Sequence, residues 1–203
     1  MIWNKLFRRP RNDEAAFRLY RKVADQARRE EFYLHAGVPD TVESRFEMVA
    51  LHAFLAMHRL KRGGEEAKAL GQKLFDVFFD DLDQTMREMG VGDLSVGKKV
   101  KKLASSFYGR ISAYETGLAG GPQALQEAIR RNIYGAEGPD TAQLTLMGAY
   151  TARAVAGLAA QKEAALLGGE IRFPEPPNGK DVAATREARR IGQGGLEPHD
   201  ISA

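Results

Sequence analysis

The carboxylates best spaced for metal chemistry stand between positions 76 and 83. Asp76, Asp80 and Asp83 recur at steps of four and three residues, so a helix places them on one face. Helical bundles that hold two metal ions use carboxylates in this way, but they add Glu-x-x-His pairs, and the sequence contains none. A solvated acidic face, or one paired with arginine, is therefore favoured over a metal site, and we expect no metal or other cofactor.

The potential nucleophiles and bases also fall short of a catalytic set. The sequence has no cysteine, which excludes thiolate chemistry and Cys-ligated metals. His52 and His58 lie six residues apart and cannot share an ion as an i, i+4 pair would, so we expect hydrogen-bonded core histidines. Ser105, Ser106 and Ser112 have no convincing base near them in the sequence. We therefore expect a protein that is not an enzyme.

Lysines cluster at the start of the predicted fourth helix, on the side opposite its apolar residues. The cluster comprises Lys98, Lys99, Lys101 and Lys102. Cations at a helix N-terminus oppose the macrodipole by a few tenths of a kcal/mol each, so helix stability does not explain them. The cluster predicts attraction to an anionic surface such as ribosomal RNA, acidic lipid or an acidic protein; the alternative is a solvated face with acids from elsewhere in the fold. Asp80 and Asp81, in the acidic stretch 76–83, are candidates for contact with a basic partner.

The N-terminal segment, residues 1–11, mixes apolar groups with cations. These residues include Trp3, Lys5, Leu6, Phe7, Arg8 and Arg9. The composition is typical of a small anchor at a membrane surface, and a frayed terminus is the alternative. No secretory signal is present, and the best apolar stretch, 142–167, is interrupted by three charged residues, so we expect a protein on the cytoplasmic side. The mild net charge of +3 argues against a general polyanion binder, and we expect no DNA partner.

Helical periodicity recurs along the sequence, whereas alternating strand patterns are almost missing. The predicted fold is all-α, a single compact bundle of about six helices. We expect these helices from Asn12 onward, over 40–60, 65–89, 95–118 and 122–134, and from beyond Asp140 to about Leu167. The second helix is apolar on nearly every side between Phe46 and Leu60, which predicts a place in the middle of the bundle.

The composition changes after Gly168 and Gly169. Residues 171–173 predict a short extended piece, and the prolines that follow forbid regular structure. From Asn178 on, the polar composition predicts disorder, with a transient helix over 183–190. The predicted organisation is thus a basic and aromatic segment (1–11), a helical domain (12–170) and a tail that is extended and then disordered (171–203).

Several blocks of the sequence resemble a known family. They are Gly37-Val38-Pro39-Asp40-Thr41 with Arg45-Phe46-Glu47-Met48 and Leu51-His52; Met89-Gly90-Val91-Gly92-Asp93-Leu94-Ser95-Val96-Gly97-Lys98-Lys99-Val100-Lys101 with Phe107-Tyr108-Gly109-Arg110 and Tyr114; and the stretch 75–88. These blocks are similar to the signature of the ubiquinol–cytochrome c chaperone family, over about residues 15–165. Because the sequence lacks a transit peptide, the resemblance suggests a bacterial member.

The resemblance implies a non-enzymatic assembly factor for the cytochrome bc complex, ubiquinol–cytochrome c reductase. Its client would be newly made cytochrome b or another subunit of that complex, with the ribosome, a small helper subunit and anionic membrane as further contacts. It would act peripherally, at the inner face of the cytoplasmic membrane. Surplus apolar groups such as Phe79, Met86 and Tyr108 would shield hydrophobic client segments. The alternative is a peripheral helical module that binds anionic lipid or RNA through the lysine cluster.

Overall fold

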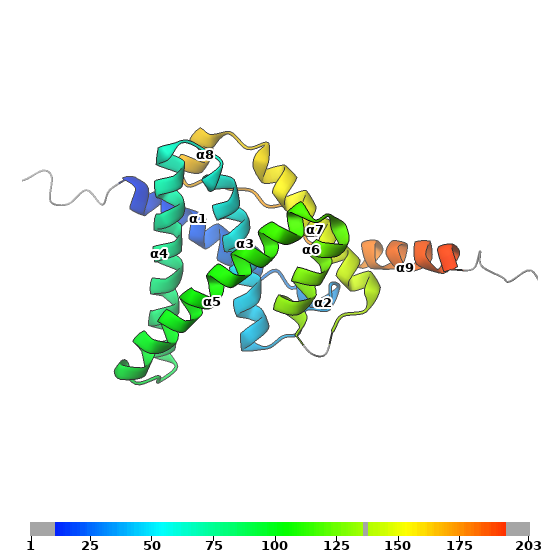
Figure 1. Ribbon diagram of the computed structural model, residues 1–203, viewed down its shortest axis with the longest axis horizontal. Coiled ribbons are helices and arrows are strands. Elements are labelled where there is room, and N and C mark those ends of the chain that lie inside the picture. The colour runs from blue at the N-terminus through cyan, green and yellow to red at the C-terminus, as the bar shows by residue number, and fades with distance from the viewer. Residues whose placement is uncertain (1–10, 136–137, 194–203) are drawn as a thin grey trace, which may run out of the picture.

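The structure is a computed structural model that describes residues 11–135 and 138–193 (Figure 1). Its elements are α1 (Arg11–Ala27), α2 (Glu31–Leu34), α3 (Val42–Lys61), α4 (Glu65–Glu88), α5 (Asp93–Ala119), α6 (Pro122–Ile129), the π-helical turn η2 (Arg130–Tyr134), α7 (Thr141–Ala159), α8 (Glu163–Leu167) and α9 (Gly179–Gln193). No strand occurs in the described ranges, which confirms the all-α prediction. The basic N-terminal segment that includes Trp3 and Arg9 lies outside them.

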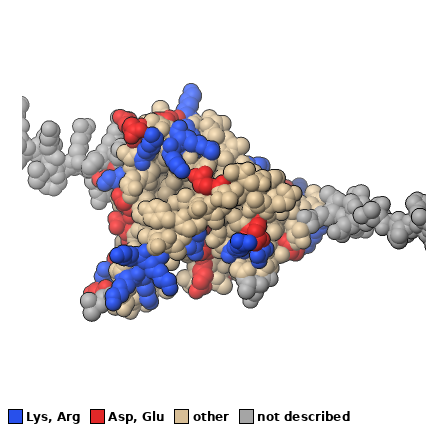
Figure 2. Space-filling view, in the orientation of Figure 1, with Lys and Arg blue, Asp and Glu red and all other residues tan. Residues whose placement is uncertain are grey.

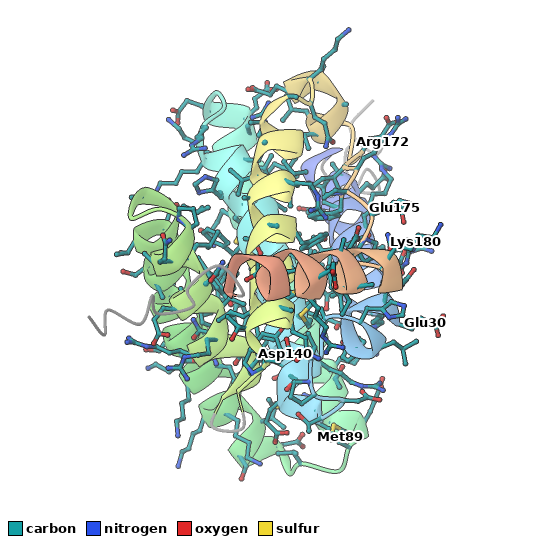
Figure 3. The ribbon with its side chains drawn as sticks, turned by 90° about the vertical axis from the view of Figure 1, so that its right-hand side faces the viewer. Glu30, Met89, Asp140, Arg172, Glu175 and Lys180 are labelled. Atoms are coloured by element: carbon teal, nitrogen blue, oxygen red, sulfur yellow. The ribbon has the colours of Figure 1, made fainter. Side chains whose placement is uncertain are left out.

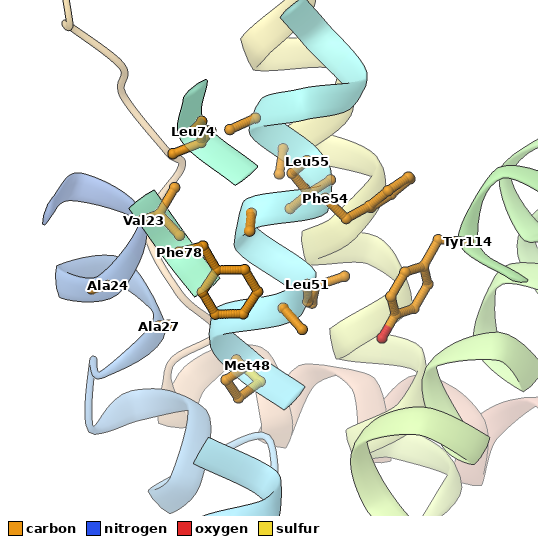
Figure 4. Packing of buried hydrophobic residues seen from close by; sticks show 14 of the residues in the cluster. Val23, Ala24, Ala27, Met48, Leu51, Phe54, Leu55, Leu74, Phe78 and Tyr114 are labelled. Atoms are coloured by element: carbon orange, nitrogen blue, oxygen red, sulfur yellow. The ribbon is translucent and has the colours of Figure 1, made fainter. Parts of the chain in front are cut away.

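Helix α3 occupies the centre of the molecule, as its sequence predicts. It packs against α1, α4 and α7, and its buried side chains include Met48, Leu51, Phe54 and Leu55 (Figure 4). A helix with apolar groups on all sides is stable only when neighbours cover each side. The long hairpin of α4 and α5 flanks it and extends to the lower left in Figure 1.

Some observed helix boundaries differ from the predicted ones, and at α3 the capping side chain determines where the helix begins. Thr41, one residue beyond Asp40, caps α3, because its side chain accepts a hydrogen bond from the backbone nitrogen of Ser44 at 3.1 Å. Asp40 instead pairs with Arg45, at 2.6 Å. The predicted last helix is divided in two, since α7 ends at Ala159 and α8 begins at Glu163.

The segment that follows α8 is held by specific contacts. The backbone carbonyl of Pro174 accepts a hydrogen bond from Gln26 Nε2 at 3.0 Å, and Ile171 is buried. Ordered but irregular backbone is therefore present where the prolines predicted it.

Helix α9 stands where disorder was predicted from Asn178 on, and it contains the transient helix that was predicted over 183–190. It lies across α7 (Figure 3), and Arg186 pairs with Asp140 at 2.6 Å. Asn178 accepts hydrogen bonds from the backbone nitrogens of Lys180 and Asp181, which caps the helix. This segment is helical because its packing against α7 stabilises it, whereas its own composition does not. Residues 194–203 lie outside the described ranges.

Candidate partner-binding surface

The four clustered lysines all lie exposed on the first turns of α5. No carboxylate of the described residues comes within ion-pair distance of Lys98, Lys99, Lys101 or Lys102. The nearby Asp93 is instead held by Arg87. Figure 2 shows the resulting group of cations at the lower left, where α5 begins. Acids from elsewhere in the described fold therefore do not neutralise the cluster.

Tyr108 continues this surface two turns further along α5. Its side chain is 57% exposed, and its ring packs at 5.5 Å, centroid to centroid, on the ring of Phe75 from α4. Seven residues separate Tyr108 from Lys101, so both lie on one face of the helix. We call Lys98, Lys99, Lys101, Lys102 and Tyr108 the α5 surface.

The other predicted contact residues lie elsewhere. Phe79 is only 7% exposed and packs against Phe107 between α4 and α5, so its ring belongs to the core and cannot shield a client, contrary to expectation. Asp80 is exposed, and Asp81 accepts a hydrogen bond from Tyr20 of α1 at 2.5 Å. Both aspartates line a hollow beside α1 and so do not join the α5 surface.

An apolar groove between α1, α2, α3 and α4 was not predicted as a site. Tyr33, Phe46 and Leu82 line it, and Leu34 and Val42 stand on its edge with exposed fractions of 68% and 65%. Its volume is about 520 Å³. The sequence signal that could have revealed it is the apolar run Phe32-Tyr33-Leu34. In the structure only Phe32 of the three is buried, which leaves Tyr33 and Leu34 at the groove. We call this hollow the Tyr33 groove.

A buried ion pair fixes α5 against the central helix. Arg110 of α5 donates to both carboxylate oxygens of Glu47 of α3 through Nε and Nη2, and Nε lies 2.6 Å from Oε2. The side chains are 19% and 9% exposed. Burial raises the pKa of Glu47, although the Arg110 hydrogen bonds and charge oppose that effect. The pair thereby sets the position of the α5 surface relative to the rest of the bundle.

His52 is a core histidine, as its sequence context predicts. Its Nδ1 lies 2.7 Å from the Met48 carbonyl oxygen and therefore donates to it, while Nε2 accepts from the Tyr150 hydroxyl, also at 2.7 Å. The side chain is fully buried. Burial lowers the pKa of His52 to about 4, because the charged form loses its hydration.

We expect acid to destabilise the fold through His52. Its pKa lies below the 6.5 of an unperturbed imidazole, so between pH 6.5 and pH 4 the unfolded chain binds a proton that the native state does not. The contribution of His52 to the free energy of unfolding is constant above pH 6.5 and falls by about 3 kcal/mol as the pH drops through this window. Urea unfolding of the wild type and His52→Gln at pH 7 and pH 4 measures the difference. An equal loss of unfolding free energy in the two proteins would contradict the expectation. His35→Gln, which changes a different histidine, is the matched control.

The described residues offer neither a metal cluster nor a membrane span. No three His, Asp or Glu side chains in the described ranges are placed to share an ion. Asp83 is bound by Arg87 at 2.5 Å, as expected of an acidic face paired with arginine. None of the helices in those ranges is long and apolar enough to cross a lipid bilayer.

Comparisons with known proteins identify the family. The model of the family described as "Ubiquinol-cytochrome C chaperone" matches residues 34–173. The chain is 29% identical to ubiquinol-cytochrome c reductase complex assembly factor 1 of Mus musculus, over 78% of this chain and 54% of that protein. The Homo sapiens protein of that name is 28% identical, over 85% and 52%. The chain thus spans about half the length of these curated relatives.

A solved relative shares the fold. The structure titled "Crystal structure of the Cbp3 homolog from Brucella abortus" superposes with a TM-score of 0.73 at 39% identity, over 81% of this chain and 91% of that chain. Because the family model matches more than half of the sequence, the chain belongs to the ubiquinol–cytochrome c chaperone family.

Proposed function

We propose that the protein is a non-enzymatic assembly factor that holds newly made cytochrome b at the membrane surface until ubiquinol–cytochrome c reductase is assembled. The family and the relatives' names support the bc complex as the target. The observation that carries the proposal for this chain is the α5 surface, whose lysines have no carboxylate partner among the described residues. Cations left without counter-charge attract anionic surfaces, such as lipid headgroups or acidic polypeptide.

The apolar part of the client would contact two places. Tyr108 adds an exposed ring on the same helix, two turns beyond the lysines. The Tyr33 groove adds Leu34 and Val42, which replace the buried Phe79 as candidate contacts for hydrophobic segments. Exposed apolar groups around a hollow of this kind are typical of polypeptide-binding surfaces. Contact with an anionic membrane, with the ribosome or with a small helper subunit would add to these.

A deletion strain tests the proposed function. We expect it to accumulate less cytochrome b and to lose quinol oxidation by the bc complex, while a plasmid copy restores both. Transcript levels for the subunits should stay unchanged, because a chaperone acts after synthesis. Normal amounts of cytochrome b together with normal quinol oxidation would contradict the proposal.

The α5 surface also favours a second candidate, a peripheral module that binds anionic lipid or RNA without a client. Such binding would weaken steeply with salt, because it depends on the release of counterions. The two candidates differ in how much function survives when the lysines are neutralised.

A further inference from the structure

The hairpin of α4 and α5 ends in an exposed apolar group close to the lysine cluster. Met89, the C-cap residue of α4, has an exposed fraction of 65%, and it lies at the lower end of the molecule in Figure 3. Val91 follows in the same turn and is half-buried. We call residues 89–92 the hairpin tip. A single exposed apolar side chain is common in proteins, so its meaning depends on what surrounds it.

The hairpin tip is a closed turn. Gly90 has a positive φ of 80°, and its backbone nitrogen donates to the Arg87 carbonyl oxygen at 3.0 Å. The backbone nitrogen of Val91 donates to the Met86 carbonyl oxygen, also at 3.0 Å. These two hydrogen bonds, with a glycine in the left-handed conformation, form a Schellman motif, which ends a helix in a defined geometry. The motif holds the backbone around Met89 in one conformation, so the exposure of this side chain belongs to the folded chain.

The charges around the tip leave an excess of cations. Arg87 binds both Asp83 and Asp93, and Glu88 accepts a hydrogen bond from Gln84 at 2.9 Å. The four lysines that follow on α5 have no acidic partner in the described ranges. With the acids included, the end of the hairpin from position 83 to position 102 holds five cations and three carboxylates. The tip is therefore an apolar end backed by positive charge.

The spacing between the tip and the lysines fits a membrane interface. Lys98 and Lys102 stand five and nine residues after Asp93, the first residue of α5, which is about 8 and 14 Å along the helix axis. Apolar side chains of interfacial segments enter a bilayer by about 5–10 Å, to the boundary between headgroups and acyl chains. Lysine side chains have long stems and keep their charged ends at the headgroups. A hairpin that enters tip first would bring Met89 to the acyl boundary and the lysines to the phosphates together.

We propose that the hairpin tip is a membrane-contact site, which inserts Met89 into the interface of an anionic lipid bilayer while Lys98, Lys99, Lys101 and Lys102 bind the lipid phosphates. Lipid is favoured over RNA, because proteins bind RNA through phosphates, hydroxyl groups and stacked bases, for which an aliphatic thioether is poorly suited. An acidic polypeptide would satisfy the lysines but offers no apolar phase to the tip. This inference rests on the proposed function, which places the protein at the membrane surface, and it names the lipid contact.

Tip-first insertion would also bring Tyr108 close to the membrane. Tyr108 lies ten residues beyond Lys98, about 15 Å further along α5, so its exposed ring would stand near the outer edge of the headgroups. A client segment that leaves the bilayer beside the hairpin would then meet this ring first.

The first test places a fluorescent label at the tip. Because the sequence has no cysteine, Met89→Cys in the full chain gives one site for a nitrobenzoxadiazole group. With vesicles of phosphatidylcholine and phosphatidylserine, the label should brighten and emit at shorter wavelength, and lipids that carry a quencher in the acyl chain should darken it. Vesicles of pure phosphatidylcholine should produce little change. The same label on Ala156→Cys, an exposed position on α7, should stay in water.

A second variant tests the apolar contact while the lysines remain. Met89→Asp should lower the affinity for the anionic vesicles about tenfold in a sedimentation assay, because a carboxylate replaces an apolar group at the lipid interface. Met89 is exposed, so the fold should not change, and Met89→Leu, which keeps an apolar group, should bind as the wild type does. Ala156→Asp adds the same negative charge on α7 and should also leave the affinity unchanged.

Three outcomes would overturn the membrane contact. The first is a label at position 89 that stays in water while the protein sediments with vesicles, because another part of the chain would then carry the binding. The second is equal affinity of Met89→Asp and the wild type. The third is no binding to the vesicles, whether or not ribosomal RNA is bound. The deletion strain tests the proposed function separately: if it loses cytochrome b while the label stays in water, only the membrane contact of the tip fails.

Discussion

Replacement of Arg110 by alanine is expected to lower the free energy of unfolding by about 3–5 kcal/mol, the usual cost of removing one partner from a buried ion pair. Glu47 would remain in the core with no cation beside it, because its side chain is 9% exposed and Arg110 is its ion-pair partner. Such a loss is a large part of the roughly 5–15 kcal/mol that stabilises a typical domain. Chemical denaturation followed by circular dichroism measures it directly.

Two controls separate the buried charge from other effects of this change. The double variant Glu47→Leu with Arg110→Met should recover most of the stability, because apolar groups of similar size replace buried pairs at little cost. Arg131→Ala breaks an exposed pair with Glu127 and should cost less than about 1 kcal/mol. If Arg110→Ala behaves like Arg131→Ala, the ion pair does not hold α5 in place.

Neutralising the lysine cluster should have the largest effect on binding. Four glutamines in place of Lys98, Lys99, Lys101 and Lys102 remove cations worth about 1 kcal/mol each near an anionic membrane, which is about a thousandfold in affinity. The lysines are exposed, so the fold should not change. Sedimentation with vesicles of phosphatidylcholine and phosphatidylserine, against pure phosphatidylcholine, gives the affinity. Binding of the wild type should also weaken as salt is raised.

The matched control removes the same net charge elsewhere. It changes four exposed lysines outside the cluster to glutamine: Lys22, Lys73, Lys162 and Lys180. A local cationic surface predicts a much smaller loss in this control, whereas equal losses would mean that only net charge matters. In the deletion strain, the cluster variant also separates the two proposed functions. A client-binding chaperone should keep part of its function, and a pure lipid or RNA binder should lose all of it.

The parts of the fold that sequence predicts well are those decided by local patterns. The central position of α3 follows from its apolar residues on every side, and the exposed lysines follow from their place opposite the apolar residues of α5. The helix boundaries were predicted within a few residues, except where the chain divides into α7 and α8. Helix α9 was predicted only as a transient helix over 183–190, because contacts with α7 and not composition stabilise it.

The candidate site was harder to predict because it is built across distant segments. Phe75, Phe78 and Phe79 are neighbours in sequence, and periodicity does not tell which of them a second helix will cover; α5 covers Phe79 through Phe107. Glu47 and Arg110 are separated by 63 residues, although each lies in a block that resembles the family. No local pattern couples such a pair.

Site-specific photo-crosslinking shows which proteins touch the two proposed contact surfaces in the cell. A photoreactive amino acid at Tyr108 or at Val42 samples the α5 surface and the Tyr33 groove, and one at Ala156, exposed on α7, is the control. In cells that are assembling the complex, we expect crosslinks to cytochrome b or another subunit of the bc complex from positions 108 and 42, and few from 156. Crosslinks from 156 alone, or no bc-complex subunit at any position, would contradict it.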